Sequence, residues 1–128
     1  MSTSNAKKTV YVFGNPHLAY DNKAVQVAES LKSECKIVWS QNPEELFSTK
    51  EDELVILDVI KGITRPRLFS DHTQFLKNPA SSTHDIDLSF VLNLMPALGI
   101  TKKIKILGIP QEGNPKEFAK EVTPWLNS

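Results

Sequence analysis

The segment ELVILDVI, residues 53–60, constrains the fold more than any other part of the chain. Its apolar residues follow one another directly, whereas a strand with one solvent-exposed face alternates apolar and polar residues. Such a run is typical of a strand that is buried on both faces of a parallel sheet, under helices on each side. Asp58 interrupts the run, and a buried charge is costly unless it is paired or hydrogen-bonded. The segment therefore predicts a central strand with a functional carboxylate near its carboxyl end.

Strand and helix patterns alternate along most of the remaining chain. Runs rich in β-branched and aromatic residues predict further strands at residues 9–14, 35–39 and 103–109. Apolar residues at helical spacing predict amphipathic helices at residues 22–32, 88–98 and 115–125. A short helix at 42–47 and a short edge strand at 66–69 complete the expected elements. The alternation predicts one domain, residues 1–128, that is a three-layer α/β/α sandwich on a mainly parallel, twisted sheet of about five strands. Residues 1–8 are expected to form a flexible tail.

Capping signals predict where the helices begin and end. The helix at 88–98 has an apolar stripe made of Leu88, Val91, Leu92, Met95 and Leu98. Asp87 is expected to cap its beginning and Gly99 to terminate it. Asn42 before Pro43, and Asn114 before Pro115, have the order of an N-cap followed by proline in the first helical position.

The composition narrows the classes of function. Lys plus Arg and Asp plus Glu both count 15, so the net charge is zero and supplies no broad attraction to nucleic acid or anionic membranes. The apolar runs are far shorter than the roughly 20 residues of a membrane span, and the first eight residues lack the apolar core of a secretion signal. The single cysteine, Cys35, excludes an internal disulfide and is expected to be a small core residue. We expect a cytoplasmic protein without nucleic-acid or membrane partners.

Three residues are expected to meet at one edge of the sheet. Asp21 follows the first strand, Asp58 ends the central strand, and His84 lies just before the helix at 88–98. Functional groups of open α/β sheets gather beyond the carboxyl ends of the strands, where these three positions fall. Two carboxylates and an imidazole suit a divalent cation such as Ni, Mn, Fe or Zn. A simpler interpretation also stays open, in which Asp21 only caps the following helix and His84 is a surface loop residue.

Motifs of several other chemistries are absent from the sequence. Gly14 stands alone after the first strand, so the glycine spacing of a dinucleotide-binding turn is missing. There is no phosphate-binding G-x-x-x-x-G-K-[ST] loop, no G-x-S-x-G nucleophile turn and no H-E-x-x-H zinc motif. The three candidate metal ligands, Asp21, Asp58 and His84, are therefore the main candidate site.

Three blocks in the sequence resemble the hydrogenase maturation endopeptidases, which trim the C-terminal extension from the large subunit of nickel–iron hydrogenases. The blocks are VYVFGNPHLAYDNKAVQVAESL, ELVILDVIKG, and SSTHDIDLSFVLNLMPALG followed by KIKILGIPQE. The resemblance implies that Asp21, Asp58 and His84 contact a metal, with Asp21 and Asp58 also catalytic. It implies that the partner is a hydrogenase large-subunit precursor and that the nickel is carried by this substrate. We expect the protein to be a monomer.

Two other functions stay open at this point. The first is a member of the family that binds a metal-bearing partner without cleaving it. The family's run of acidic and small residues is changed here, since Ala19 and Tyr20 precede Asp21 and Lys23 adds a positive charge. The second is an α/β module that binds a small molecule, in which Asp21 only caps a helix.

Overall fold

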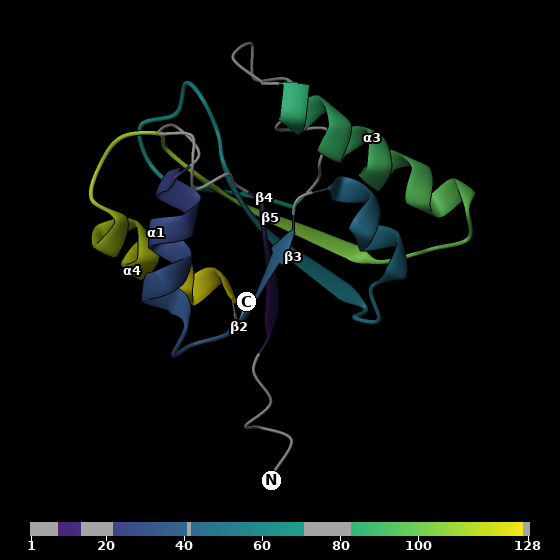
Figure 1. Ribbon diagram of the computed structural model, residues 1–128, viewed down its shortest axis with the longest axis horizontal. Coiled ribbons are helices and arrows are strands. Elements are labelled where there is room, and N and C mark those ends of the chain that lie inside the picture. The colour runs from purple at the N-terminus through teal and green to yellow at the C-terminus, as the bar shows by residue number, and fades with distance from the viewer. Residues whose placement is uncertain (1–7, 14–21, 41, 71–82, 127–128) are drawn as a thin grey trace, which may run out of the picture.

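The computed structural model describes residues 8–13, 22–40, 42–70 and 83–126 (Figure 1). Five strands form one sheet in the order β2-β1-β3-β5-β4. Their bounds are β1 Thr9–Phe13, β2 Lys36–Ser40, β3 Glu53–Val59, β4 Arg67–Phe69 and β5 Lys103–Ile109. The pairings of β1, β2, β3 and β5 are parallel, and β4 is an antiparallel edge strand next to β5. The predicted central strand and the short edge strand are both confirmed.

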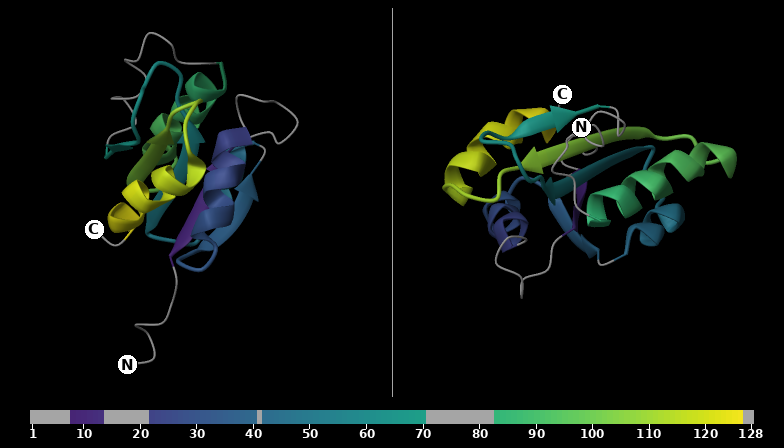
Figure 2. Two further views of the ribbon diagram at one scale, coloured as in Figure 1. Left: turned by 90° about the vertical axis from the view of Figure 1, so that its left-hand side faces the viewer. Right: turned by 90° about the horizontal axis from the view of Figure 1, so that it is seen from above.

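The helices lie on both faces of the sheet, which gives the three layers that the sequence predicts (Figure 2). Helices α1, Asn22–Leu31, and α4, Pro115–Leu126, cover one face. Helix α3, Thr83–Ala97, and the short 3₁₀ helix η2, Pro43–Ser48, cover the other face. We refer to these as the α1/α4 face and the α3 face.

Strand β3 is buried on both faces, as the apolar run at residues 54–57 predicts. Val55 and Leu57 belong to the core cluster under α1 and α4, whereas Leu54 and Ile56 belong to the cluster under α3. Side chains of a strand alternate between the two faces. Asp58 therefore projects from the α3 face, the same side as Ile56.

Helix α3 begins earlier than the sequence predicts. Its first residue is Thr83, so Asp87 lies within the helix and is not its N-cap, and His84 lies in the first turn rather than before the helix. The sequence interpretation took the first buried stripe residue, Leu88, as the beginning of the helix, but a helix can start with a turn that does not contribute to the stripe.

Gly99 terminates α3 as predicted, but Leu98 does not belong to its buried stripe. Gly99 has a φ of 82°, and the N–H of Ile100 donates to the carbonyl of Met95 at 2.9 Å, which closes the helix end. Leu98 lies after the last helical residue and is 57% exposed, so it does not extend the buried stripe. The other four stripe residues are buried as expected.

The remaining caps and the cysteine behave as predicted. Asn114 Oδ1 accepts a hydrogen bond from the N–H of Lys116 at 2.9 Å at the beginning of α4. Asn42 precedes η2, and its N–H donates to the Glu45 carboxylate at 3.3 Å. Cys35 is buried in the core under α1. No helix within the described ranges combines the length and the apolar content that crossing a membrane requires.

Candidate functional site

One residue from each strand forms a row across the sheet at the carboxyl ends of the parallel strands. Strand register places its five members side by side, in the order Ser40, Phe13, Asp58, Gly108 and Arg67. Residues that are opposite one another on neighbouring strands project from the same face. Phe13 lies in the core cluster under α3, so the whole row belongs to the α3 face. We call these five residues the carboxyl-end row, and Asp58 is at its centre.

Asp58 is 2% exposed and has uncharged neighbours in the row. On one side lies Phe13 and on the other Gly108. A Cβ atom at Gly108 would be 2.8 Å from Ile60 Cγ1 and 2.9 Å from Phe69 Cε2, so only glycine lets these two side chains close over β5. A buried ionisable group at the carboxyl end of a central strand is a candidate for function, because burying a charge costs free energy.

The backbone of His84 lies at the beginning of the helix that covers the same face as Asp58. Helix α3 has 15 residues, a length of roughly 22 Å, and it is joined to the beginning of β5 by residues 98–102. It therefore runs back along β5, which is about as long, and its first turn lies toward the carboxyl ends of the strands (Figure 1). The side chain of His84 is outside the described residues, so its contact with a metal stays a prediction.

Asp21 also lies outside the described residues, and its role as a metal contact or as a helix cap stays a prediction. The elements on either side are described: β1 ends at Phe13, next to Asp58, and α1 begins at Asn22. Lys23 follows directly, and its Nζ donates to the carbonyl oxygen of Gly113 at 2.9 Å. This contact directs the Lys23 charge toward the loop that precedes α4.

The described side chains alone do not form a metal centre. Among them, no group of three or more His, Cys, Asp or Glu residues is arranged to hold an ion. Only Asp58 of the three predicted ligands has a described side chain. The predicted trio is therefore neither confirmed nor contradicted.

Two cavities among the described residues lie away from Asp58. One, of about 510 Å³, is bounded by the last turn of α3 and the first residues of β5, including Met95, Pro96 and Lys103. The other, of about 520 Å³, lies between the loop after β3 and α4, at Arg65 and Trp125. Volume alone does not make either of them the site, because neither contains a buried ionisable group at the carboxyl ends of the strands.

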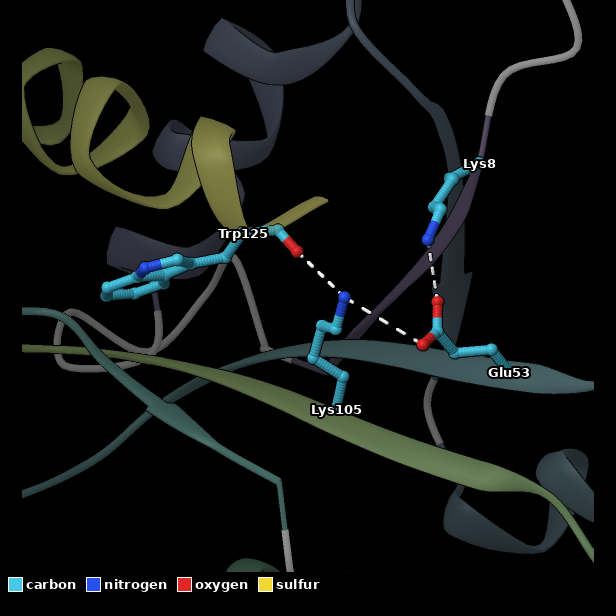
Figure 3. A network of polar contacts seen from close by, with 4 residues as sticks. All are labelled: Lys8, Glu53, Lys105 and Trp125. Atoms are coloured by element: carbon cyan, nitrogen blue, oxygen red, sulfur yellow. Dashed lines mark hydrogen bonds and ion pairs between the residues drawn. The ribbon is translucent and has the colours of Figure 1, made fainter. Parts of the chain in front are cut away.

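The opposite end of β3 holds a network of charges whose partners are within the chain (Figure 3). Glu53, the first residue of β3, accepts a hydrogen bond from Lys8 Nζ at 2.7 Å, and Lys105 Nζ lies 3.8 Å from its other oxygen. Lys105 is buried and donates to the carbonyl oxygen of Trp125 at 2.9 Å. The hydrogen bond from Lys8 is the main reason that the pKa of Glu53 is lowered. This network joins four segments and has the character of a structural contact.

Among the described residues, two buried hydroxyl groups have no hydrogen-bond partner. They are Ser40 Oγ, at one end of the carboxyl-end row, and Ser89 Oγ on α3. Sequence reasoning missed Ser40 and Arg67, the two ends of the row. A signal for them was not available in the sequence, because strand register is set by contacts between distant segments.

The structure has the α/β fold that the sequence predicts, with four parallel strands, an antiparallel edge strand and helices on both faces. A buried acid lies at the carboxyl end of its central strand. No family model and no curated protein matches the sequence. Solved structures do match the fold, and those reported below come from hydrogenase maturation endopeptidases and from a further endopeptidase.

One of these structures is the hydrogenase maturating endopeptidase HybD from E. coli. It has 18% sequence identity and a TM-score of 0.61, over 93% of this chain and 86% of that chain. The hydrogenase 3 maturation protease has 17% identity and a TM-score of 0.65, over 96% of this chain and 90% of that chain. The solution structure of an endopeptidase from E. coli has 20% identity and a TM-score of 0.61, over 93% and 88%. At these identities the likeness shows a shared fold along nearly the whole chain.

Proposed function

We propose that this chain is an endopeptidase of hydrogenase maturation, which removes the C-terminal extension from a nickel-loaded large-subunit precursor. The observation that carries the proposal is Asp58, an acid buried at the carboxyl end of a central strand. Two further lines support it: the fold is shared with hydrogenase maturation endopeptidases, and the sequence blocks that contain Asp21 and His84 resemble those of that family. The proposal includes a monomeric cytoplasmic enzyme.

The roles proposed for the three residues follow from their chemistry. Asp21, Asp58 and His84 would contact the nickel ion that the precursor brings, so that only a metal-loaded precursor is held in position. A divalent ion also relieves the repulsion between two nearby carboxylates. One of the two, Asp21 or Asp58, would accept a proton from the attacking water as general base, while the ion polarises the scissile carbonyl group.

The test is a cleavage assay with purified precursor, with and without nickel, read by mass spectrometry. We expect the native protein to shorten the nickel-loaded precursor only. Asp58→Asn keeps the size of the side chain and removes its charge, and it should lower the cleavage rate by roughly 10²–10⁴-fold. Asp52→Asn is the matched control, because Asp52 is exposed at the other end of β3 and should be dispensable.

Three outcomes separate the proposal from its alternatives. Equal cleavage by Asp58→Asn and by the native protein would reject the proposed chemistry. Association with the nickel-loaded precursor without any shortening would identify a binding protein instead of a peptidase. The small-molecule module predicts neither cleavage nor association, and a melting temperature that no divalent ion changes.

A further inference from the structure

Arg67 occupies a special position relative to Asp58. Both belong to the carboxyl-end row, and Gly108 alone lies between them. Two strand spacings separate their Cα atoms, which is about 10 Å. Phe69, two residues after Arg67, belongs to the core cluster under α3, so Arg67 projects from the same face as Asp58.

The guanidinium group of Arg67 is held in place and remains available to a ligand. Its Cζ atom lies 5.2 Å from the centre of the Phe69 ring, a stacking contact that restricts the side chain without neutralising its charge. The residue is exposed, and no carboxylate of the described residues forms an ion pair with it.

Arg65 provides the contrast. It is two residues earlier in the chain, and its Nη2 lies 3.3 Å from Glu121 Oε1. Its charge is therefore already matched by α4. Of these two arginines, Arg67 is the one whose fork of N–H donors can receive a carboxylate from outside the chain.

We propose that Arg67 determines specificity by binding a carboxylate group of the precursor's C-terminal extension. This assignment rests on the proposed function. The distance from Asp58 corresponds to about three residues of an extended peptide, so the carboxylate would lie about three residues from the bond that is cut. The group is an acidic side chain of the extension or, in an extension of only about three residues, the carboxylate at the end of its chain. Both present the same chemistry to an arginine.

The experiment measures KM and kcat on three nickel-loaded precursors. The first has its natural extension, the second has the acidic residues of the extension changed to amides, and the third has several glycines added to move the terminal carboxylate. The enzymes compared are the native protein, Arg67→Gln, Arg67→Lys and the control Arg65→Gln. The melting temperature of each variant is measured as well and should not change, because both arginines are exposed.

We expect Arg67→Gln to raise KM about tenfold on the natural precursor with little change in kcat, since a charged hydrogen bond of this kind is lost. The KM of Arg67→Lys should lie between those of the native protein and Arg67→Gln, because lysine keeps the charge but lacks the planar guanidinium group. On the precursor that lacks the recognised carboxylate, the KM of the native protein should rise to that of Arg67→Gln, and the substitution should raise KM no further. The altered precursor on which the two KM values become equal identifies the source of the carboxylate. Arg65→Gln should behave as native throughout.

An unchanged KM for Arg67→Gln, with a native protein that cleaves, would overturn the role of Arg67 and leave the proposed function intact. The same rise in KM on all three precursors would also overturn it, because the effect would not depend on a carboxylate. A native protein that cleaves no precursor rejects the proposed function, and the assignment of Arg67 with it.

Discussion

The two carboxylates at the ends of strand β3, Glu53 and Asp58, have different surroundings. At the beginning, Glu53 is met by Lys8 and Lys105, and Lys105 also reaches the Trp125 carbonyl of α4 (Figure 3). At the end, Asp58 lies between Phe13 and Gly108 in the carboxyl-end row and is 2% exposed. Only five positions in the sequence separate the two acids.

This difference indicates which end of the sheet contributes polar contacts that stabilise the fold. At the beginning of β3, charges from four segments satisfy one another, so the acid there contributes to holding the sheet and α4 together. At the end of β3, the carboxyl-end row runs from Ser40, whose buried hydroxyl has no hydrogen-bond partner among the described residues, to Arg67, with which no described carboxylate forms an ion pair. Substitutions at the two ends should therefore have opposite consequences, and the following predictions test this.

The largest effect on stability is expected for Lys105→Met. The methionine fills similar space, but it removes the hydrogen bond to the Trp125 carbonyl and one of the cations near Glu53. Losing a hydrogen bond from a charged group costs about 2 kcal/mol of the free energy of unfolding. Urea unfolding, followed by circular dichroism, measures this change.

Lys36→Met is the control for that experiment. Lys36 also lies in a strand of the sheet, β2, but it is exposed, so its replacement should change the free energy of unfolding by less than about 0.5 kcal/mol. Equal effects at both positions would show that the buried network does not contribute to stability, and the contrast between the two ends of β3 would be lost.

A smaller effect is expected from acid. The pKa of Glu53 is lowered from 4.5, mainly by the hydrogen bond from Lys8. A carboxyl whose pKa is lower in the folded state contributes stability above its unfolded pKa and loses it as the pH falls through the folded value. Glu53→Gln should therefore be less stable than native by about 1 kcal/mol at pH 7, and the difference should shrink below pH 4.5. Urea unfolding at pH 7, 5, 4 and 3 provides the comparison, and a difference that stays constant with pH would contradict it.

Much of the fold could be predicted from the sequence because the patterns that determine it are local. The apolar run that ends at Leu57 predicted a strand with helices on both faces, and Asn114 before Pro115 marked the beginning of α4. The beginning of α3 could not be found in this way. Its first turn precedes the buried stripe, and Asp87, a good capping residue, stands inside the helix where that preference has no effect.

The candidate site could be predicted only in part. Asp58 was recognisable because a charge within an apolar run has no local explanation. The roles of Asp21 and His84 are still predictions, since their side chains lie outside the described residues. Ser40 and Arg67 depend on strand register, which places distant segments side by side and leaves no signal in either segment alone.

The smallest effect is expected at Ser40, and its sign should be the reverse of that at Lys105. Ser40 is 2% exposed and its hydroxyl has no hydrogen-bond partner in the described part of the chain, so the folded state includes the cost of removing this group from water. Ser40→Ala removes the hydroxyl and leaves the rest of the side chain, and it should raise the free energy of unfolding by up to about 1 kcal/mol. Ser48→Ala, at the exposed end of η2, should leave the free energy of unfolding unchanged.

These results would complete the comparison between the two ends of the sheet. Loss of a polar group at the beginning of β3 would destabilise the protein, whereas loss of a polar group in the carboxyl-end row would stabilise it. A stability gain at Ser40 marks a residue that the fold does not need, whereas a loss comparable to that of Lys105→Met would mean that both ends of the sheet are built for stability alone.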